Sequence, residues 1–133
     1  MAEALEQRGL TKASGARALG DLEDLARGSF TRKVLLGGNE CDIAVRLNDG
    51  RLLAIECKVS NSALNSVKRL VRETGGKAGA WNRDFGARVA TAAVLAGVFK
   101  LGNLLDAQDN HHVVIYWEHN LDPLIDFVRA AAR

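Results

Sequence analysis

Two acids and a lysine are the residues of this sequence that could do chemistry together: Asp42, Glu56 after thirteen intervening residues, and Lys58 two positions further on. Opposed carboxylates repel each other on an ordinary sheet, so a pair held close together needs a compensating positive charge. A lysine supplies one such charge, whereas a divalent cation satisfies both acids at once. Magnesium prefers oxygen ligands, usually one or two carboxylates completed by water and phosphate oxygens. If the three residues meet, their types therefore predict a Mg2+ site with an ammonium group beside it.

A β-hairpin would bring the two acids together. Residues 40–47 and 51–59 have the alternation of apolar and polar side chains that predicts strands, and Asn-Asp-Gly at 48–50 predicts a three-residue loop between them. Such a loop sets a register in which Asp42 lies opposite Glu56, with β-carbons about 4.5–5.5 Å apart. The alternative is a solvated surface hairpin whose charges are incidental. The apolar opposite face of the hairpin and the basic segment that follows it favour a functional site.

The same register places Cys41 opposite Cys57. We expect both cysteines to be reduced core thiols, and a cross-strand disulfide to form only in an oxidising sample.

The elements around the hairpin follow from hydrophobic periodicity and from glycine and proline positions. Helices are expected at residues 13–27, 61–73, 101–108 and 122–132, strands at residues 30–36, 88–99 and 112–117, and a loop at residues 75–79. A helix is the alternative at 88–99, where alanine is frequent. The core order is helix, three strands, helix, strand, which predicts an α/β fold with a mixed β-sheet flanked by helices. We expect a mobile polar segment at 1–12 and a single domain at 13–133.

Charge is unevenly distributed along the chain. The net charge is only +2, but residues 61–100 carry seven basic and two acidic side chains, a local charge of +5. This basic segment would suit an anionic partner, although a solvated helix face also explains it. Residues 1–10 lack the apolar core of a signal peptide, and the most apolar stretch, 89–99, is too short to cross a bilayer. We therefore expect a cytoplasmic protein without a membrane-spanning segment.

The pattern D-x13-E-x-K within this order of elements resembles the PD-(D/E)xK nuclease superfamily. More specifically, the stretches IECKVSNSALNSVKRL, AAVLAGVFKLGNL and VIYWEHNLDPLIDFV resemble the catalytic region of XamI-type type II restriction endonucleases. The resemblance spans roughly residues 35–130. It departs from the superfamily pattern at the position before the first acid, where Cys41 stands in place of the expected proline.

The resemblance implies a restriction-endonuclease-like fold and Mg2+-dependent cleavage of DNA phosphodiester bonds, with Mn2+ expected to substitute. It implies that Asp42 and Glu56 bind the metal, that the main-chain carbonyl of Cys57 is a further ligand, and that Lys58 is the catalytic lysine. In the superfamily a glutamate of the first helix can be another ligand, and Glu23 is the candidate here. A solvent-facing glutamate explains Glu23 equally well.

Further candidates come from the residues around this pattern. Glu40, two residues before Asp42 on the same predicted face, could assist the metal or lie at the rim of the site. The helix expected after Lys58 begins beside the acids, where its positive end would suit a phosphate. Candidate DNA contacts are Ser60, Asn61, Ser62, Asn65, Lys68, Arg69, Arg72, Lys77 and Arg83. Either Ser60 or Asn61 is also explained as the cap of that helix.

Three functional alternatives remain at this point. The first is the catalytic domain of a restriction enzyme, and a homodimer would let two sites address both strands of DNA. The second is a structure-specific repair or recombination nuclease of the same fold. The third is a non-catalytic DNA-binding module, although a binder has no need of two opposed carboxylates.

Overall fold

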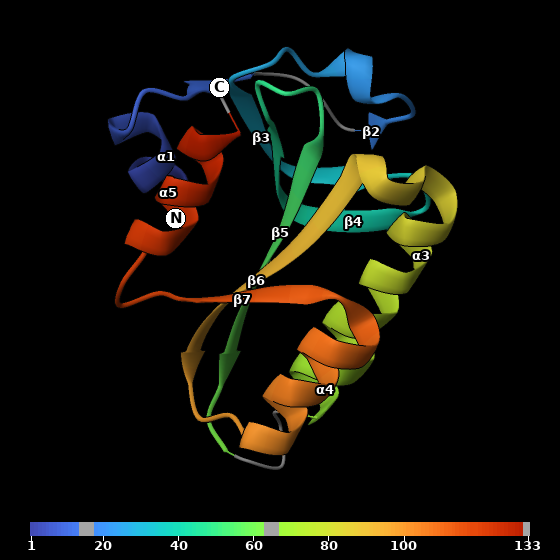
Figure 1. The fold of residues 1–133 in the computed structure, drawn as a ribbon, viewed down its shortest axis with the longest axis vertical. Coiled ribbons are helices and arrows are strands. Elements are labelled where there is room, and N and C mark those ends of the chain that lie inside the picture. The colour runs from blue at the N-terminus through green and yellow to red at the C-terminus, as the bar shows by residue number, and fades with distance from the viewer. Residues whose placement is uncertain (14–17, 63–66, 132–133) are drawn as a thin grey trace.

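A seven-stranded mixed sheet forms the centre of the computed structural model, which describes residues 1–13, 18–62 and 67–131 (Figure 1). The main path of the sheet has the order β1-β3-β4-β5-β6-β7, and β2 pairs with β3 beside it. The middle strands β3, β4 and β5 are antiparallel, whereas β5, β6 and β7 are parallel. The strands are β1 (Thr11–Lys12), β2 (Ala18–Leu19), β3 (Ser29–Leu36), β4 (Asn39–Arg46), β5 (Leu52–Ser60), β6 (Val89–Gly97) and β7 (Val113–Trp117).

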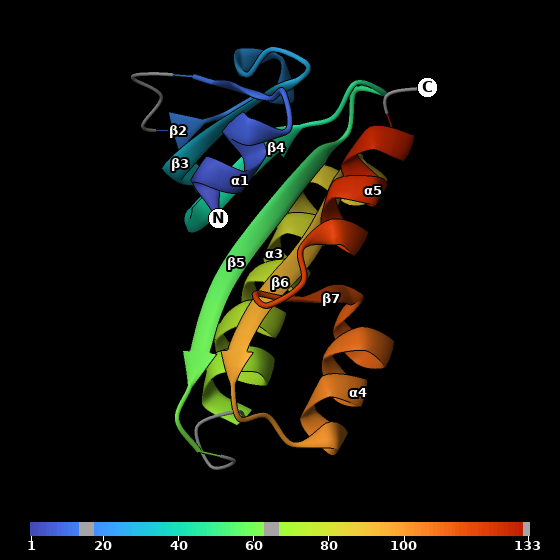
Figure 2. The same ribbon diagram turned by 90° about the vertical axis from the view of Figure 1, so that its left-hand side faces the viewer.

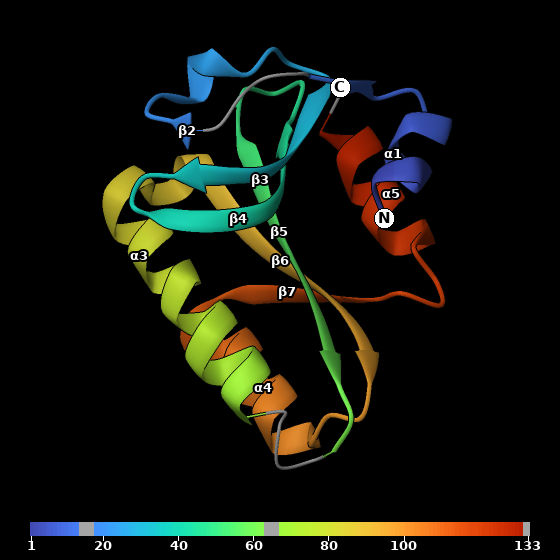
Figure 3. The ribbon, with the colours of Figure 1, turned by 180° about the vertical axis from the view of Figure 1, so that it is seen from behind.

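Helices cover both faces of this sheet (Figures 2 and 3). On one face, α1 (Ala2–Gln7) and α5 (Asp122–Ala130) share an apolar core with the inner strands, to which α1 contributes the buried Leu5. On the other face, the π-helical segment η2 (Val67–Thr74) runs directly into α3 (Gly75–Phe85), which packs beside α4 (Leu101–His111). Two short 3-10 turns, η1 (Leu22–Asp24) and η3 (Gly86–Arg88), complete the described elements.

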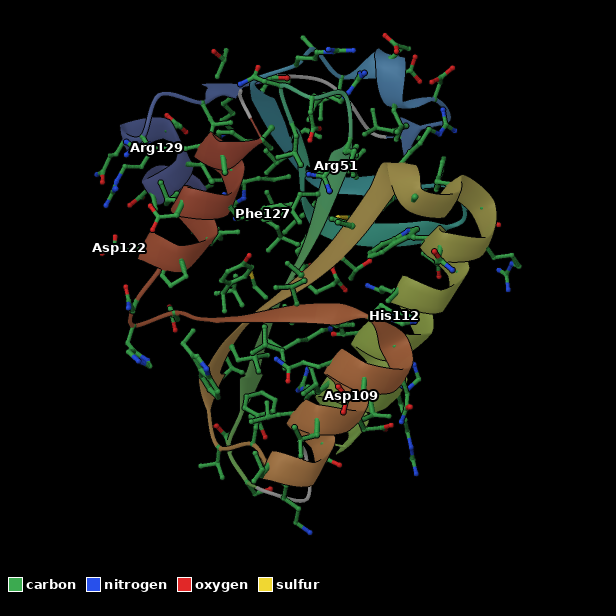
Figure 4. All side chains as sticks on the ribbon, viewed as in Figure 1. Arg51, Asp109, His112, Asp122, Phe127 and Arg129 are labelled. Atoms are coloured by element: carbon green, nitrogen blue, oxygen red, sulfur yellow. The ribbon has the colours of Figure 1, made fainter. Side chains whose placement is uncertain are left out.

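The predicted fold class is confirmed: the chain is an α/β protein with a restriction-endonuclease-like mixed sheet flanked by helices. The predicted hairpin register is also confirmed, from the pair Arg46 and Leu52 to the pair Ile43 and Ile55. Arg51, directly after the loop, places its guanidinium 5.6 Å from the centre of the Phe127 ring, which ties the hairpin to α5 (Figure 4). The strand predicted at 88–99, the short helix after it, and the final strand and helix are present as β6, α4, β7 and α5.

Two predicted elements are wrong. The helix expected at 13–27 is replaced, over its described residues, by β2 and the η1 turn. The loop expected at 75–79 is instead the first part of α3, whose helical path begins at Val67. Residues 1–12, expected to be mobile on their polar composition, form α1 and β1. In the part of the chain that the structure describes, we find no helix with the length and apolarity needed to cross a membrane.

Candidate active site

The two central acids meet where β4 and β5 stop pairing through their main chains. The main-chain ladder of the two strands is regular up to Ile43 and Ile55. At the next position side chains replace it: the Asp42 N–H donates to Glu56 Oε2 at 3.0 Å, and the Cys57 N–H donates to Asp42 Oδ2 at 2.9 Å. Each carboxylate is therefore fixed by the main chain of the opposite strand. The structure brings Asp42 and Glu56 together, as the hairpin register predicts.

A left-handed residue of β3, Lys33, lies opposite Asp42 at the position where β4 and β5 stop pairing. Lys33 lies between Arg32 and Val34, which pair with Ile43 and Cys41, so it is opposite Asp42 on β3. Its φ is 49°, a left-handed conformation that is uncommon for a residue other than glycine. On β4, Ile43 packs into the core below α1 and α5, whereas Cys41, two residues earlier, packs into the core that contains Trp81 of α3. The side chains of Cys41 and Ile43 thus pack into different cores, and the N–H of Asp42 between them donates to Glu56.

Glu56 is fully buried but not isolated. Its side chain is 0% exposed, and its Oε1 accepts from the Lys77 ammonium of α3 at 2.7 Å. Burial raises the pKa of Glu56 above its ordinary value, and the charge of Asp42 raises it further, while Lys77 and the Asp42 N–H oppose this shift. Burial also disfavours the charged form of Lys77, yet Glu56 and Asp42 hold the pKa of Lys77 above its ordinary value. The acid pair therefore already has one positive partner within the protein.

Lys58 has a different partner from the one that the sequence suggests. It lies on the same strand as Glu56, but its ammonium contacts Glu73 Oε2 at 2.9 Å, at the end of η2. This hydrogen bond holds the pKa of Glu73 below its ordinary value. The ammonium in contact with Glu56 is therefore that of Lys77, whereas Lys58 contacts Glu73 and lines the same pocket as Asp42.

A pocket of about 540 Å³ opens next to the acids. Asp42, Cys57 and Lys58 line it from β4 and β5, and the exposed Arg32 and Lys33 line it from β3. Sequence reasoning missed these two basic residues because β3 reads only as a strand. Their positions become meaningful once the pairing of β3 with β4 places them beside Asp42.

The remaining metal candidates do not join the acid pair. Glu23 lies in the η1 turn, where its exposed carboxylate contacts Arg46 at 3.2 Å, four residues along β4 from Asp42. Glu40 is exposed at the far end of β4 and pairs with Leu35. Cys57 is exposed and follows Glu56 directly, so its main chain is at the site.

The two cysteines are free. Cys41 is buried, and its Sγ donates to the Ile43 carbonyl at 3.1 Å. Burial raises the pKa of Cys41, and burial followed by the charge of Asp42 raises that of Cys57 to about 11. Neither thiol is thus an activated nucleophile.

Most of the candidate DNA contacts that the structure describes are exposed. Lys68, Arg69 and Arg72 are exposed on η2, and Arg83 is exposed near the end of α3, where it contacts Asp84 at 3.5 Å. Asn61 is exposed and Ser62 is half-buried after β5, whereas Asn65 lies outside the described residues.

Two of these candidates are corrected by the structure. Ser60 is buried, and its hydroxyl donates to the Ser62 carbonyl at 2.7 Å, so it closes the turn after β5. Lys77 is not on a flexible glycine loop but in α3, with its ammonium on Glu56.

The donor set of the acid pair consists of carboxylate oxygens, which are ligands that Mg2+ accepts. Within residues 1–13, 18–62 and 67–131, no group of three or more His, Cys, Asp or Glu side chains could hold a metal. Two carboxylates would therefore be completed by main-chain carbonyls, water or phosphate oxygens, which is the coordination that Mg2+ commonly accepts and that a structural zinc site does not.

Comparisons with known proteins point to one family. The family model described as XamI restriction endonuclease matches residues 1–117. The type II restriction enzyme XamI of Xanthomonas campestris pv. amaranthicola is 53% identical over 57 residues, which are 43% of this chain and 21% of that enzyme. The chain thus matches about a fifth of the length of this curated relative.

A solved structure shares the fold. Protein VC1899 from Vibrio cholerae superimposes with a TM-score of 0.56 and 16% identity, over 77% of this chain and 28% of that one. This likeness concerns the fold alone. The family model, in contrast, covers most of the chain and includes every strand and the acid pair. The chain belongs to the XamI restriction endonuclease family.

Proposed function

We propose that this chain is the catalytic domain of a restriction-enzyme-like endonuclease, which hydrolyses DNA phosphodiester bonds with Mg2+, or with Mn2+ in its place. The observation that carries the proposal is the pair of crossed hydrogen bonds that fix Asp42 and Glu56 at the end of the β4–β5 ladder. Family membership supports nuclease activity, and the electrostatics favour a cation at this place. Two carboxylates whose positions do not depend on a metal are a preorganised pair of oxygen ligands.

In this mechanism Asp42 and Glu56 would hold the metal, with the Cys57 carbonyl as a third protein ligand. A bound magnesium ion supplies Lewis-acid chemistry: it lowers the pKa of water and stabilises negative charge on phosphoryl and leaving oxygens. The N–H groups of Asp42 and Cys57 orient the two carboxylates before DNA arrives. Lys58 lines the same pocket as Asp42, and its role is to stabilise charge at the phosphate or to position the attacking water.

DNA would reach the acids through the pocket beside β3 and β4. Arg32 and Lys33 are exposed there and would contact phosphates on either side of the cleaved bond. The exposed basic residues of η2, Lys68, Arg69 and Arg72, follow β5 in the chain and are further candidates for phosphate contacts. We propose further that two copies act as a homodimer to cut both strands, and that the enzyme works in the cytoplasm, where DNA is available to it.

The test is cleavage of supercoiled plasmid by the purified chain with Mg2+, with Mn2+ and with EDTA. Nicked or linear product is expected with either metal and absent with EDTA. Sequencing the cut ends distinguishes a recognised site from random cuts, and flap, nick and junction substrates test the repair-nuclease alternative. Binding of DNA without any cut in either metal would refute the endonuclease proposal and favour a binding module.

A further inference from the structure

Two ion pairs connect β5 to the helical segment that runs from η2 into α3. Glu56 and Lys58 are two residues apart on the strand, and Glu73 and Lys77 are four residues apart on the helical segment. Two strand residues span about 6.6 Å and four helical residues about 6 Å, so the two spacings match. The Lys77–Glu56 contact is 2.7 Å and the Lys58–Glu73 contact is 2.9 Å. Both pairs therefore form at the same time. In one pair the strand supplies the acid, and in the other it supplies the base.

The two pairs differ in their surroundings. Glu56 is 0% exposed at its side chain and Lys77 is 25% exposed, whereas Lys58 and Glu73 are 13% and 31% exposed, so only the first pair contains a fully buried charge. Both Glu56 oxygens have partners, Lys77 at Oε1 and the Asp42 N–H at Oε2. A buried carboxylate without a positive partner is costly, and here a second carboxylate lies next to it. In the protein without a bound metal, Lys77 meets this need.

We propose that Lys77 is a positioning residue that serves as the built-in counter-ion of the acid pair, and that its ammonium competes with the divalent cation for Glu56. The inference rests on the proposed function, because it takes Glu56 as a metal ligand. A cation that binds Glu56 through Oε1 must displace the ammonium or share the oxygen with it, and two positive groups at that distance repel. Lys77 thus keeps Glu56 oriented without metal, and the same contact weakens metal binding.

The experiment measures Mn2+ and Mg2+ binding to the full chain by calorimetry without DNA, together with the melting temperature in EDTA. Lys77→Gln is expected to bind Mn2+ about tenfold more tightly than the parent, because one positive charge next to a dication is removed. It is also expected to melt at a lower temperature in EDTA, and to gain more from added Mn2+ than the parent does. Lys12→Gln, at an exposed lysine of β1, removes the same charge far from the site and should change neither quantity.

Lys77→Arg provides a second variant that keeps the charge. A guanidinium can bind a carboxylate with two parallel hydrogen bonds, so it should hold Glu56 more firmly and weaken Mn2+ binding several-fold. Unchanged or weaker Mn2+ binding by a folded Lys77→Gln protein would overturn the competition. If that variant does not fold, equal or tighter binding by Lys77→Arg would overturn it instead. A parent protein that cuts no DNA and binds neither cation would refute the proposed function itself, which is a different result from retained binding without competition.

Discussion

Asp42 and Glu56 are joined by a hydrogen bond from main chain to side chain: the Asp42 N–H donates to Glu56 Oε2 at 3.0 Å. In a regular antiparallel ladder this N–H would bind a main-chain carbonyl of the next strand. Here the separation of β4 from β5 makes room for two carboxylates between the strands. Two main-chain N–H groups thus orient the two acids instead of continuing the ladder. This is expected of a preorganised ligand pair and not of an incidental surface hairpin.

The first prediction concerns Asp42→Asn. The asparagine carbonyl can still accept from the Cys57 N–H, and the substitution removes the repulsion between two neighbouring carboxylates. We therefore expect an unchanged or higher melting temperature, retained DNA binding and a loss of plasmid cleavage of at least about 100-fold. Asp126→Asn, at an exposed acid of α5, is the control for net charge. Full cleavage by Asp42→Asn would remove this residue from the active site.

The second prediction separates shape from charge at Glu56. Glu56→Ala leaves the partly exposed Lys77 ammonium and the Asp42 N–H without their partner, and losing such a partner costs about 1–3 kcal/mol of unfolding free energy. Glu56→Gln keeps an oxygen acceptor for one of these donors and should cost less. Both variants should fail to cut DNA. Urea unfolding of the two proteins checks the order, and equal stability of Glu56→Ala and the parent would contradict it.

The sequence was informative about the hairpin because a loop of known length sets the register of both strands. Leu47 donates to the Arg51 carbonyl at 2.8 Å, as the Asn-Asp-Gly loop predicts, and the paired positions follow from there. The separation of the strands beyond Ile43 could not be predicted in this way. It coincides with the left-handed backbone of Lys33 and with a change from one core to the other along β4, neither of which leaves a local pattern.

The two wrong elements have specific physical causes. Leu19, Leu22 and Leu25 are spaced by three residues, which fits a helix. All three are buried, but Leu19 lies in β2, Leu22 in η1 and Leu25 directly after η1. The glycines at 75–79 predict a loop, whereas Gly75 is the first residue of α3 and lies where this helix approaches α4. A Cβ at Gly75 would lie 3.0 Å from the His111 ring, so the glycine serves close helix packing. Tertiary contacts decided both cases.

The role of Lys77 also depends on tertiary structure. Its glycine-rich surroundings predict a loop, and only the packing of α3 against the sheet brings Lys77 to Glu56. The one available signal was the spacing of Glu73 and Lys77, which are four residues apart and therefore share a face if the segment is helical. A helix face that carries Glu73 and Lys77 could have been predicted to form ion pairs with Lys58 and Glu56 of β5.

The third prediction is a pH dependence of metal binding. Glu56 must be ionised to bind a cation, and its pKa is raised above the ordinary 4.5, mainly by burial. Cation affinity should therefore fall as the pH is lowered from neutral. The fall should begin at a higher pH than it would for a site with an ordinary glutamate. Lys77→Gln removes a partner that lowers this pKa, so the loss of binding should move to higher pH. Calorimetric Mn2+ titrations over a pH series measure both curves, and coincident curves would contradict this cause.

The fourth prediction distinguishes Lys58 from its partner Glu73. Lys58→Ala should reduce cleavage by about 100-fold or more with DNA binding retained, whereas Glu73→Gln should leave the lysine in place and reduce cleavage much less. The pKa of Glu73 is lowered in the folded protein, so its stabilising contribution is present above the unfolded pKa and is lost as the pH falls through the folded value. At neutral pH we expect Glu73→Gln to cost about 0.5–1 kcal/mol. Equal cleavage by Lys58→Ala and the parent would reject the catalytic lysine.

The fifth prediction tests the pocket on the β3 side. Arg32→Ala and Lys33→Ala each remove an exposed positive charge from the lining that also contains Asp42. If these residues contact phosphates, each substitution should weaken DNA binding for all sequences alike, and should reduce the slope of log affinity against log salt by about 1. Fluorescence anisotropy in an Asp42→Asn background measures binding without cleavage. Lys12→Ala on β1, outside this lining, should keep the parent slope. An unchanged slope for both pocket variants would move the DNA path away from β3 and toward the exposed basic residues of η2.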